Sequence, residues 1–266
     1  MSIIETIQKR RSVRTYSGEP LREEHKAQIN EYIGQLQAPF GIKARIELIS
    51  IHANNETVKL GTYGFVKGAC DYLALVFEEA PFAETVAAGM FEQVILLCTE
   101  MDLGTCWIGG SFSRSDFKKQ IALHPNERLR IVSPVGYVSD RKRFLEKYIV
   151  GADKKHASRK PFGELFFDKS FDNPLTETAA GIYKMPLEMV RLAPSANNMQ
   201  EWRALLTDQA LHFYKKPYLW FDAIDIGIAL CHFDLTCQEL SVEGKFEFVD
   251  NVPENKGLKY VISWIN

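Results

Sequence analysis

The chain has 266 residues, and 32 Lys and Arg against 34 Asp and Glu give it a formal net charge of −2. With 46% apolar and 25% charged residues, it has the composition of a globular protein that builds its own hydrophobic core. The near-neutral charge argues against a protein that coats nucleic acid, because such affinity comes mainly from an excess of Lys and Arg that neutralises phosphates. Any anion-binding site should therefore be local.

Apolar runs in the sequence are short. The longest, near 72–77 and 94–98, are flanked by acidic residues and fall far below the roughly 20 residues that cross a bilayer. Residues 1–14 hold a basic cluster without the long apolar run or the small-residue cleavage site of a secretory signal. We therefore expect a cytoplasmic protein with no membrane partner and no nucleic-acid partner.

Neither the cysteines nor the histidines have the spacing of a disulfide framework or a metal site. The five cysteines are an odd number at irregular intervals, and none of the six histidines forms a His-x-x-x-His pair. The cysteines are Cys70, Cys98, Cys106, Cys231 and Cys237. We expect most of them to be small buried hydrophobic residues, and we expect no metal.

The first half of the chain is predicted to mix helices and strands. Ser2 followed by Glu5 has the spacing of a capping box, which predicts a short helix that ends near residue 10. The apolar pattern then predicts a helix at 22–36, strands at 44–52 and 71–78, a buried helix at 82–103 stopped by Gly104, a short helix from 113 and a strand at 129–138. Charges crowd residues 140–160, which is typical of a solvated loop.

After residue 173 a similar order of elements begins again. The pattern predicts a helix at 186–192, strands at 203–207 and 211–215, a long helix at 218–240, and strands at 245–249 and 259–264. A shift of 139 residues places Cys98-Thr99-Glu100 on Cys237-Gln238-Glu239, inside the two long helices. We infer an internal duplication, with lobes 1–172 and 173–266 packed about a pseudo-twofold axis like the subunits of a homodimer.

A basic cluster at the end of the first helix carries the first chemical signal. Arg10, Arg11 and Arg14 offer forked, charged donors and Ser12 adds a neutral hydroxyl, a combination that suits a phosphate monoester. The same residues could instead form a solvated helix end that the helix dipole favours. Spacing alone leaves both interpretations open.

Several segments resemble the nitroreductase family of homodimeric, FMN-dependent reductases. The Arg-x-Ser-x-Arg motif with its following aromatic residue, at 10–16, is similar to the family's opening signature, and Leu-Gly-Thr-Cys-Trp-Ile-Gly-Gly at 103–110 to its glycine loop. Residues 159–165 are similar to its basic carboxy-terminal segment, and Gly136-Tyr137 sits where its last core strand would. The resemblance implies an α+β fold with three layers, α/β/α, and mainly antiparallel sheets, duplicated here as a pseudo-dimer.

The most specific match is Leu-Ala-Pro-Ser-Ala-Asn-Asn-Met-Gln-Glu-Trp at 192–202, which is similar to the family's Ala-Pro-Ser-x-x-Asn-x-Gln-Pro-Trp loop. This loop usually follows the basic motif closely, but here it lies in the second half, and the first half has Gln-Ala-Pro-Phe-Gly at 37–41 instead. In the homodimer the loop of one subunit reaches the flavin of the other. The resemblance therefore implies a monomer with one complete FMN site.

The resemblance also implies roles for individual residues. Arg10, Ser12, Arg159 and Lys160 would hold the phosphate and ribityl end of FMN, with Arg14 toward the pyrimidine edge of its ring. Backbone amides of the glycine loop would approach the ring, and the loop of the second half would close the site. The expected cofactor-binding residues are Arg10, Arg11, Ser12, Arg14, Thr62, Tyr63, Ile108, Gly109, Gly110, Arg159, Lys160, Pro194, Ser195, Ala196 and Asn198.

Some of these residues have purely structural interpretations. Trp107 is expected to pack in the core, and Gly109-Gly110 could form a plain turn. Asn197-Asn198 could cap or turn a loop. Cys106 is not expected to be a nucleophile, because its motif contains no His.

The implied function is an oxidoreductase in which NADH or NADPH gives a hydride to N5 of FMN. A flat, electron-poor acceptor such as a nitroaromatic or a quinone then takes the electrons. Because the flavin does the chemistry, no catalytic side chain is expected. Two alternatives stay open: a flavin-binding module without catalysis, and a different flavin reaction on the same fold.

Overall fold

The computed structural model describes residues 1–53, 56–57, 60–139, 158–217 and 220–266. The chain forms two compact units, one made of Met1 and Lys9–Asp153 and the other of Ser2–Gln8 and Lys154–Asn266. These units differ from the predicted lobes 1–172 and 173–266, because the first helix and residues 154–172 belong to the second unit. The solvated loop predicted at 140–160 lies almost wholly outside the described residues.

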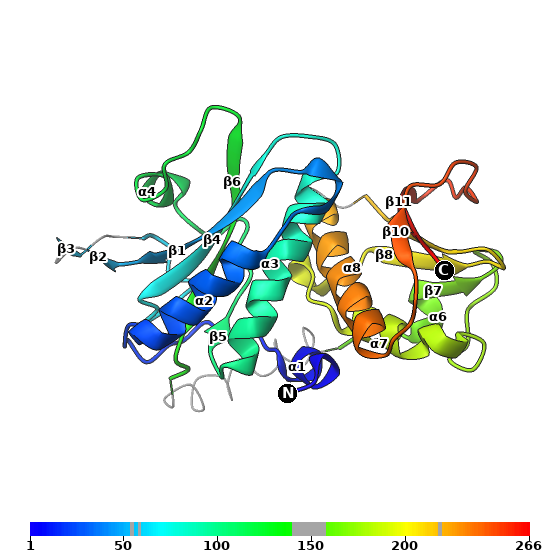
Figure 1. Cartoon of the computed structure of the whole chain (residues 1–266), viewed down its shortest axis with the longest axis horizontal. Helices are drawn as coiled ribbons and strands as arrows, with labels where there is room; N and C mark the ends of the chain where they lie inside the picture. The colour runs from blue at the N-terminus through cyan, green and yellow to red at the C-terminus, as the bar shows by residue number, and fades with distance from the viewer. Residues whose placement is uncertain (54–55, 58–59, 140–157, 218–219) are drawn as a thin grey trace. The chain divides into compact units, whose positions relative to one another are not determined.

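The first unit contains an antiparallel four-stranded sheet with the order β1-β4-β6-β5. Helices α2 and α3 contact one face of the sheet, and α4 lies on the other (Figure 1). The elements of this unit are α2 (Glu23–Gln35), η1 (Pro39–Gly41), β1 (Ala44–Ser50), β2 (His52–Ala53), β3 (Glu56–Thr57), β4 (Asp71–Glu78), α3 (Ala83–Glu100), β5 (Gly104–Thr105), α4 (Arg114–Lys118) and β6 (Glu127–Gly136).

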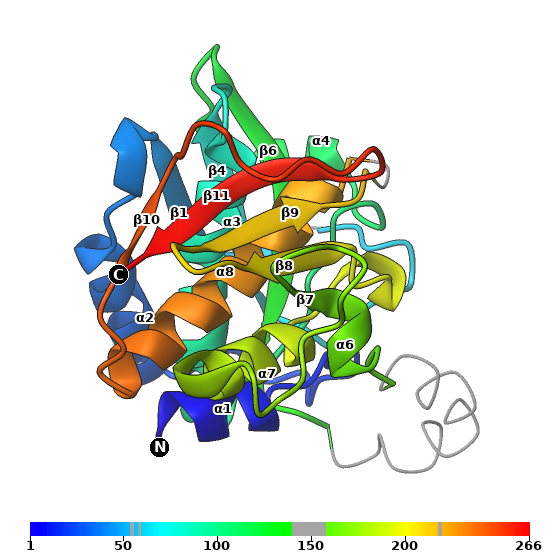
Figure 2. The same ribbon diagram turned by 90° about the vertical axis from the view of Figure 1, so that its right-hand side faces the viewer.

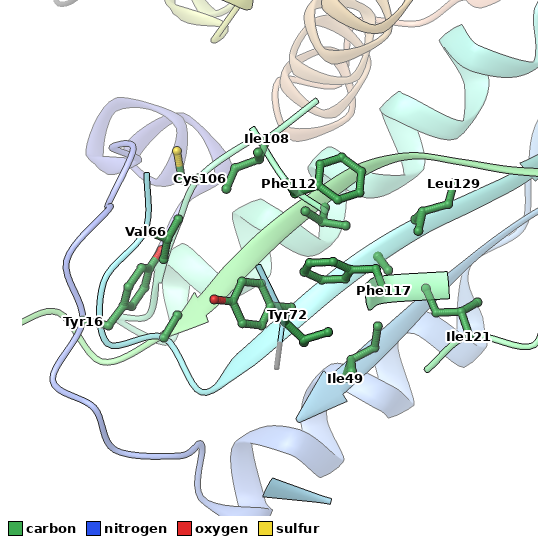
Figure 3. Close-up of a cluster of buried hydrophobic side chains, with 14 of the residues drawn as sticks. Tyr16, Ile49, Val66, Tyr72, Cys106, Ile108, Phe112, Phe117, Ile121 and Leu129 are labelled. Atoms are coloured by element: carbon green, nitrogen blue, oxygen red, sulfur yellow. The ribbon is translucent and has the colours of Figure 1, made fainter. Parts of the chain in front are cut away.

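The central strand β4 is buried on both faces, which explains its continuous apolar sequence. Figure 3 shows the core on one of these faces, where the rings of Tyr72 and Phe117 meet edge to face at 5.3 Å. Side chains alternate along a strand, so Leu73 and Leu75 belong to the opposite face, where α3 packs. The sheet is therefore held between two apolar layers.

The second unit contains a five-stranded sheet with the order β10-β11-β9-β8-β7. Figure 2 shows β11, β9, β8 and β7 in this order, and only β7 runs parallel to its neighbour. The elements are α1 (Ile3–Lys9), α6 (Phe162–Leu165), β7 (Phe166–Asp168), η2 (Gly181–Tyr183), α7 (Lys184–Leu192), η3 (Ala196–Asn198), β8 (Trp202–Leu206), β9 (Leu211–Lys215), α8 (Asp222–Glu239), β10 (Lys245–Glu247) and β11 (Lys259–Ile265).

The predicted repeat is present in both the topology and the hydrogen bonds. The strand order β1-β4-β6-β5 recurs as β8-β9-β11-β10. Both long helices have 18 residues, and α8 begins and ends 139 residues after α3. Each helix also ends in the same way: Asp102 and Ser241 have φ of 59° and 55°, and Leu103 N–H and Val242 N–H donate to the carbonyls of Cys98 and Cys237 at 2.8 Å. These are paired Schellman turns.

Most predicted elements are confirmed, with small shifts at their ends. The capping box is formed, since Ser2 N–H donates to the Glu5 carboxylate at 3.0 Å and Glu5 N–H to Ser2 Oγ at 3.1 Å. The long first helix ends earlier than predicted, because Asp102 rather than Gly104 takes the left-handed turn. The sequence did not predict α6 or β7, which are only 4 and 3 residues long.

Two further sequence expectations concern the core and the membrane. All five cysteines are buried free thiols, as expected. Across the described residues, no helix combines the length and the apolar character that a membrane span requires.

The basic segment 10–16 is held against a glycine of the first unit. Gly68 has φ of +73°, and a Cβ built there would lie 2.5 Å from the Tyr16 carbonyl oxygen. Gly64 has a similar φ of +78°, but a Cβ there would meet nothing within 4 Å. The two glycines thus have similar positive φ and differ in what a Cβ would meet.

We predict that Gly68→Ala destabilises the protein more than Gly64→Ala. A left-handed alanine lowers the free energy of unfolding of both variants by about 1–2 kcal/mol. The forced contact with the Tyr16 carbonyl lowers that of Gly68→Ala by about 1–3 kcal/mol more. Thermal unfolding of both variants and the wild type measures the difference. Equal melting temperatures for the two variants would show that segment 10–16 does not pack as described.

Candidate functional site

In the first unit, three of the predicted site segments lie side by side. Ser12 pairs with Thr105 in a parallel bridge, and Val13 N–H donates to the Thr105 carbonyl at 2.7 Å. On the next residues, Lys67 N–H donates to the Arg14 carbonyl and Tyr16 N–H to the Lys67 carbonyl, both at 2.9 Å. The basic segment is thus fixed between β5, which opens the glycine loop, and the segment 61–68.

Arg10 and Arg14 present buried donors. The Nε atoms of both side chains are buried and have no hydrogen-bond partner within the described part of the chain. Arg10 is only 6% exposed, and burial lowers the pKa of its guanidinium, while the carboxylate of Glu92 acts in the opposite direction. The Arg14 guanidinium lies 5.0 Å from the centroid of the Phe65 ring. Burial with unused donors favours the anion-site interpretation over a solvated helix end for these two residues.

The other two residues of the basic cluster are placed differently. Arg11 is exposed and donates to the Arg10 carbonyl at 2.8 Å. Ser12 is half-buried at the bridge to Thr105. Arg10 and Arg14 thus have buried Nε donors, whereas the Arg11 side chain is exposed and bonds to the neighbouring backbone.

The glycine loop leaves two backbone donors available. Ile108 is committed to β6, since its N–H donates to the Val132 carbonyl at 2.9 Å and its carbonyl accepts from Val132 at 3.0 Å. Among the described residues, the amides of Gly109 and Gly110 have no such acceptor. A Cβ at Gly110 would meet nothing within 4 Å. The expected contact through Ile108 therefore needs an amide already in use, whereas Gly109 and Gly110 remain able to donate.

Two neighbours of the glycine loop have structural roles. Trp107 Nε1–H donates to Glu92 at 2.7 Å, and its ring meets Phe91 edge to face at 4.9 Å, as its expected core role requires. Cys106 is 2% exposed, as expected of a small buried hydrophobic residue.

The segment 61–68 forms a tight turn that carries two exposed aromatic residues. Phe65 N–H donates to the Thr62 carbonyl at 2.8 Å, and Tyr63 and Gly64 both have positive φ. The Tyr63 side chain is 76% exposed, whereas Thr62 is buried. A tyrosine in the left-handed region is uncommon. The turn therefore displays Tyr63 and hides the Thr62 side chain.

In the second unit, the basic segment at 158–160 and the loop after α7 form one hydrogen-bonded group. Arg159 donates from Nη1 to Asn198 Oδ1 at 2.7 Å and from Nη2 to the Leu192 carbonyl at 3.0 Å. Asn198 Nδ2 donates to the Ser158 carbonyl at 2.7 Å, and Lys160 N–H to Gln200 Oε1 at 2.8 Å. The structure thus brings together two site segments that are far apart in sequence.

The loop itself is closed by a hydrogen bond, and three of its residues have a strained, left-handed backbone. Gln200 N–H donates to Ser195 Oγ at 2.9 Å, which ties together the two ends of η3. Asn197, Asn198 and Gln200 all have positive φ, of 51°, 56° and 51°. Asn tolerates this region but Gln rarely adopts it. Pro194, Ser195 and Ala196 are half-buried beside these residues.

Sequence reasoning missed a buried carboxylate that anchors this loop. Ala196 N–H donates to both oxygens of Asp225, each at 3.0 Å, and Asp225 is 4% exposed on α8. Burial raises the pKa of Asp225 to about 7. The signal available in the sequence was a carboxylate between Ile224 and Ile226, in the first turn of the helix. Gln200 was also missed as the partner of Lys160 and Ser195.

The donor set limits the chemistry that these residues can support. They offer guanidinium, amide and backbone N–H groups, which bind and orient an anion or a polar ring. Among the described residues, no group of three or more His, Cys, Asp and Glu side chains could hold a metal ion.

Comparison with solved structures gives matches of two kinds. A "putative nitroreductase" from Thermotoga maritima is 21% identical, with a TM-score of 0.62, and the match covers 100% of this chain and 94% of the other. A "nitroreductase with bound FMN" from Bacteroides fragilis is 15% identical with a TM-score of 0.42, covering 53% of this chain and 90% of that chain. A nitroreductase family protein from Clostridium novyi is 16% identical with a TM-score of 0.42, covering 53% and 87%.

The sequence was also compared with family models and curated proteins. No curated protein matched it. The family described as "Putative TM nitroreductase" matches residues 2–237, which is most of the chain and both units. Together with the duplicated α+β fold, this match shows that the chain belongs to that nitroreductase family.

Proposed function

We propose that the protein is an FMN-dependent oxidoreductase. It would accept a hydride from NADH or NADPH and pass the electrons to a flat, electron-poor small molecule such as a nitroaromatic or a quinone. The observation that carries this proposal is a pair of arginines next to a glycine loop with two free amides. Arg10 is buried and Arg14 half-buried, and the buried Nε donors of both have no partner among the described residues. Membership of a nitroreductase family supports the reaction class.

The residues of the first unit fit the polar parts of FMN. A phosphate offers the charged acceptors that a buried guanidinium lacks, so Arg10 would bind it with Ser12 and Arg11 nearby. Arg14 would face the pyrimidine edge of the ring, where a positive charge favours reduction of the flavin. The amides of Gly109 and Gly110 are available to the ring, and Thr62 and Tyr63 would add contacts from their turn.

The residues of the second unit would contribute as a preformed group. Arg159 is already bonded to Asn198 and Leu192, so its part would be to shape the loop as well as to add positive charge. Burial lowers the pKa of the Lys160 ammonium, and the nearby Glu201 carboxylate acts against that shift. Pro194, Ser195, Ala196 and Asn198 would then contact FMN from a loop held in one conformation.

FMN, when bound, would supply the atom that accepts and donates the hydride. The chain would bind and orient it and keep water away from the ring. One FMN would bind per chain, because the second unit has no counterpart of the Arg-x-Ser-x-Arg motif. A cytoplasmic monomer that acts on small molecules, without a nucleic-acid or membrane partner, completes the proposal.

We predict that Arg10→Ala weakens FMN binding by about 10- to 100-fold, because a charged hydrogen bond contributes about 1.5–3 kcal/mol. Fluorescence titration with FMN measures the dissociation constant. Arg128→Ala serves as the matched control, because Arg128 lies in the same unit but is ion-paired with Glu79 at the surface. Arg10→Lys keeps the positive charge, so it serves as a second variant in case Arg10→Ala does not fold.

An Arg10→Ala dissociation constant within about twofold of the wild type would overturn the phosphate assignment. Ser195→Ala and Asn198→Ala test the second group in the same titration, and we expect weaker binding or an altered flavin spectrum from both. Unchanged binding and spectra in these two variants would remove the second unit from the site.

Catalysis is tested separately from binding. We expect anaerobic addition of NADH or NADPH to the FMN-loaded protein to bleach the visible flavin absorbance, and a quinone to restore it. Persistent colour with both nucleotides would contradict the oxidoreductase and favour a module that only binds flavin. Bleaching without reoxidation by quinones or nitroaromatics would point to a different flavin reaction.

A further inference from the structure

Asp225 occupies an unusual position for a carboxylate. It lies in the first turn of α8, is 4% exposed, and both of its oxygens accept from one amide, that of Ala196. Asp225 thus connects the loop directly to the longest helix of its unit.

The charged groups near Asp225 do not neutralise it. Asp222, one turn earlier on α8, is paired with Lys215 of β9 at 3.3 Å. Glu201, at the end of the loop, is 6% exposed, and its Oε1 lies 4.0 Å from the Lys160 ammonium. Both carboxylates raise the pKa of Asp225 further after burial has raised it, while the Ala196 N–H lowers it. The ionised form of Asp225 therefore depends on its bond to the loop.

The other copy of the repeat has no carboxylate at the position equivalent to Asp225. The residue 139 positions before Asp225 is Val86, a buried apolar residue of α3. The equivalent loop in the first unit, η1, contains Phe40 with φ of 60°, and its ring meets that of Phe82 edge to face at 5.7 Å. One copy therefore holds its loop with apolar contacts, and the other with a buried carboxylate.

We propose that Asp225 is a positioning residue that holds the loop of residues 194–200 in the conformation that binds the cofactor. The inference rests on the proposed function, since it assumes that this loop contacts FMN. Asp225 itself acts through the loop backbone. The ionised carboxylate makes a charge-assisted hydrogen bond to Ala196 N–H, which is stronger than the bond to a neutral group. The charge-assisted form of this bond is present above about pH 7, and a bond to the neutral carboxyl replaces it below that pH.

The first test measures the loop without cofactor. Asp225→Asn keeps one acceptor oxygen but removes the charge, so it imitates the protonated side chain at every pH. We expect hydrogen–deuterium exchange of the peptide covering 194–200, corrected for intrinsic exchange, to be faster in Asp225→Asn than in the wild type at pH 8.5, and the difference to shrink at pH 5.5. Asp234→Asn is the matched control, because it makes the same change on the same helix at a carboxylate that is bonded to Gln238 instead of the loop.

The second test measures FMN binding. We expect Asp225→Asn to raise the FMN dissociation constant by about three- to tenfold at pH 8.5, the difference between a charged and a neutral hydrogen bond. The ratio of variant to wild type should approach one as the pH falls to 5.5. Titration of the FMN phosphate affects both proteins equally and cancels in this ratio.

The outcomes separate this inference from the proposed function. Equal loop exchange in Asp225→Asn and the wild type would overturn the positioning role. Faster loop exchange with an unchanged FMN dissociation constant would show that the loop does not serve the cofactor, and would also overturn it. A wild-type protein that binds no FMN would contradict the proposed function, and the inference would fall with it.

Discussion

The turn that ends α3 fixes the predicted site of the first unit. Asp102 takes the left-handed conformation, and the bond from Leu103 N–H to the Cys98 carbonyl reverses the chain directly into Gly104 and Thr105. Strand β5 then pairs with β6 on one side and with Ser12 on the other. Gly104 permits this approach, because a Cβ there would lie 2.8 Å from Val13 Cγ1. The end of α3 therefore determines the positions of both the basic segment and the glycine loop.

In the second unit, the same turn at the end of α8 is followed by a strand without a basic segment beside it. Ser241 reverses the chain after α8, but the strand that follows, β10, carries no neighbouring arginine motif. This copy instead has a polar loop after α7. A hydrogen bond between Ser195 and Gln200 closes the loop, and Asp225 accepts from its backbone. Two copies of one fold have thus kept the same hydrogen-bonded framework and specialised in different loops.

The sequence predicted the framework because periodic burial determines it. The long helices and central strands are read from runs such as Leu73–Phe77, whose apolar character reflects burial on both faces. Short elements such as β7 were missed, since three residues carry no period. The spacing of the motif at 10–16 left an anion site and a solvated helix end both open, and the structure adds that Arg10 is buried.

Contacts within the site could not be predicted, because they depend on tertiary partners. The neighbouring sequence does not show that the Ile108 amide donates to β6. Nor does it show that the Arg159 guanidinium donates to Asn198 and Leu192. Asp225 was visible only as a charge between two isoleucines, and its partner Ala196 lies 29 residues away. Motifs therefore predicted the candidate segments, whereas the hydrogen-bond partners of their residues came from the fold.

The most direct test of this account is the amount of FMN that one monomer binds. The protein should be titrated with FMN while light scattering measures the mass of the complex. We predict a yellow monomer near the chain mass of 30.3 kDa with one FMN per chain, because a single chain carries both the basic motif and the polar loop. Two FMN per chain, or FMN bound only by a dimer, would contradict the claim that the duplicated chain holds one complete site.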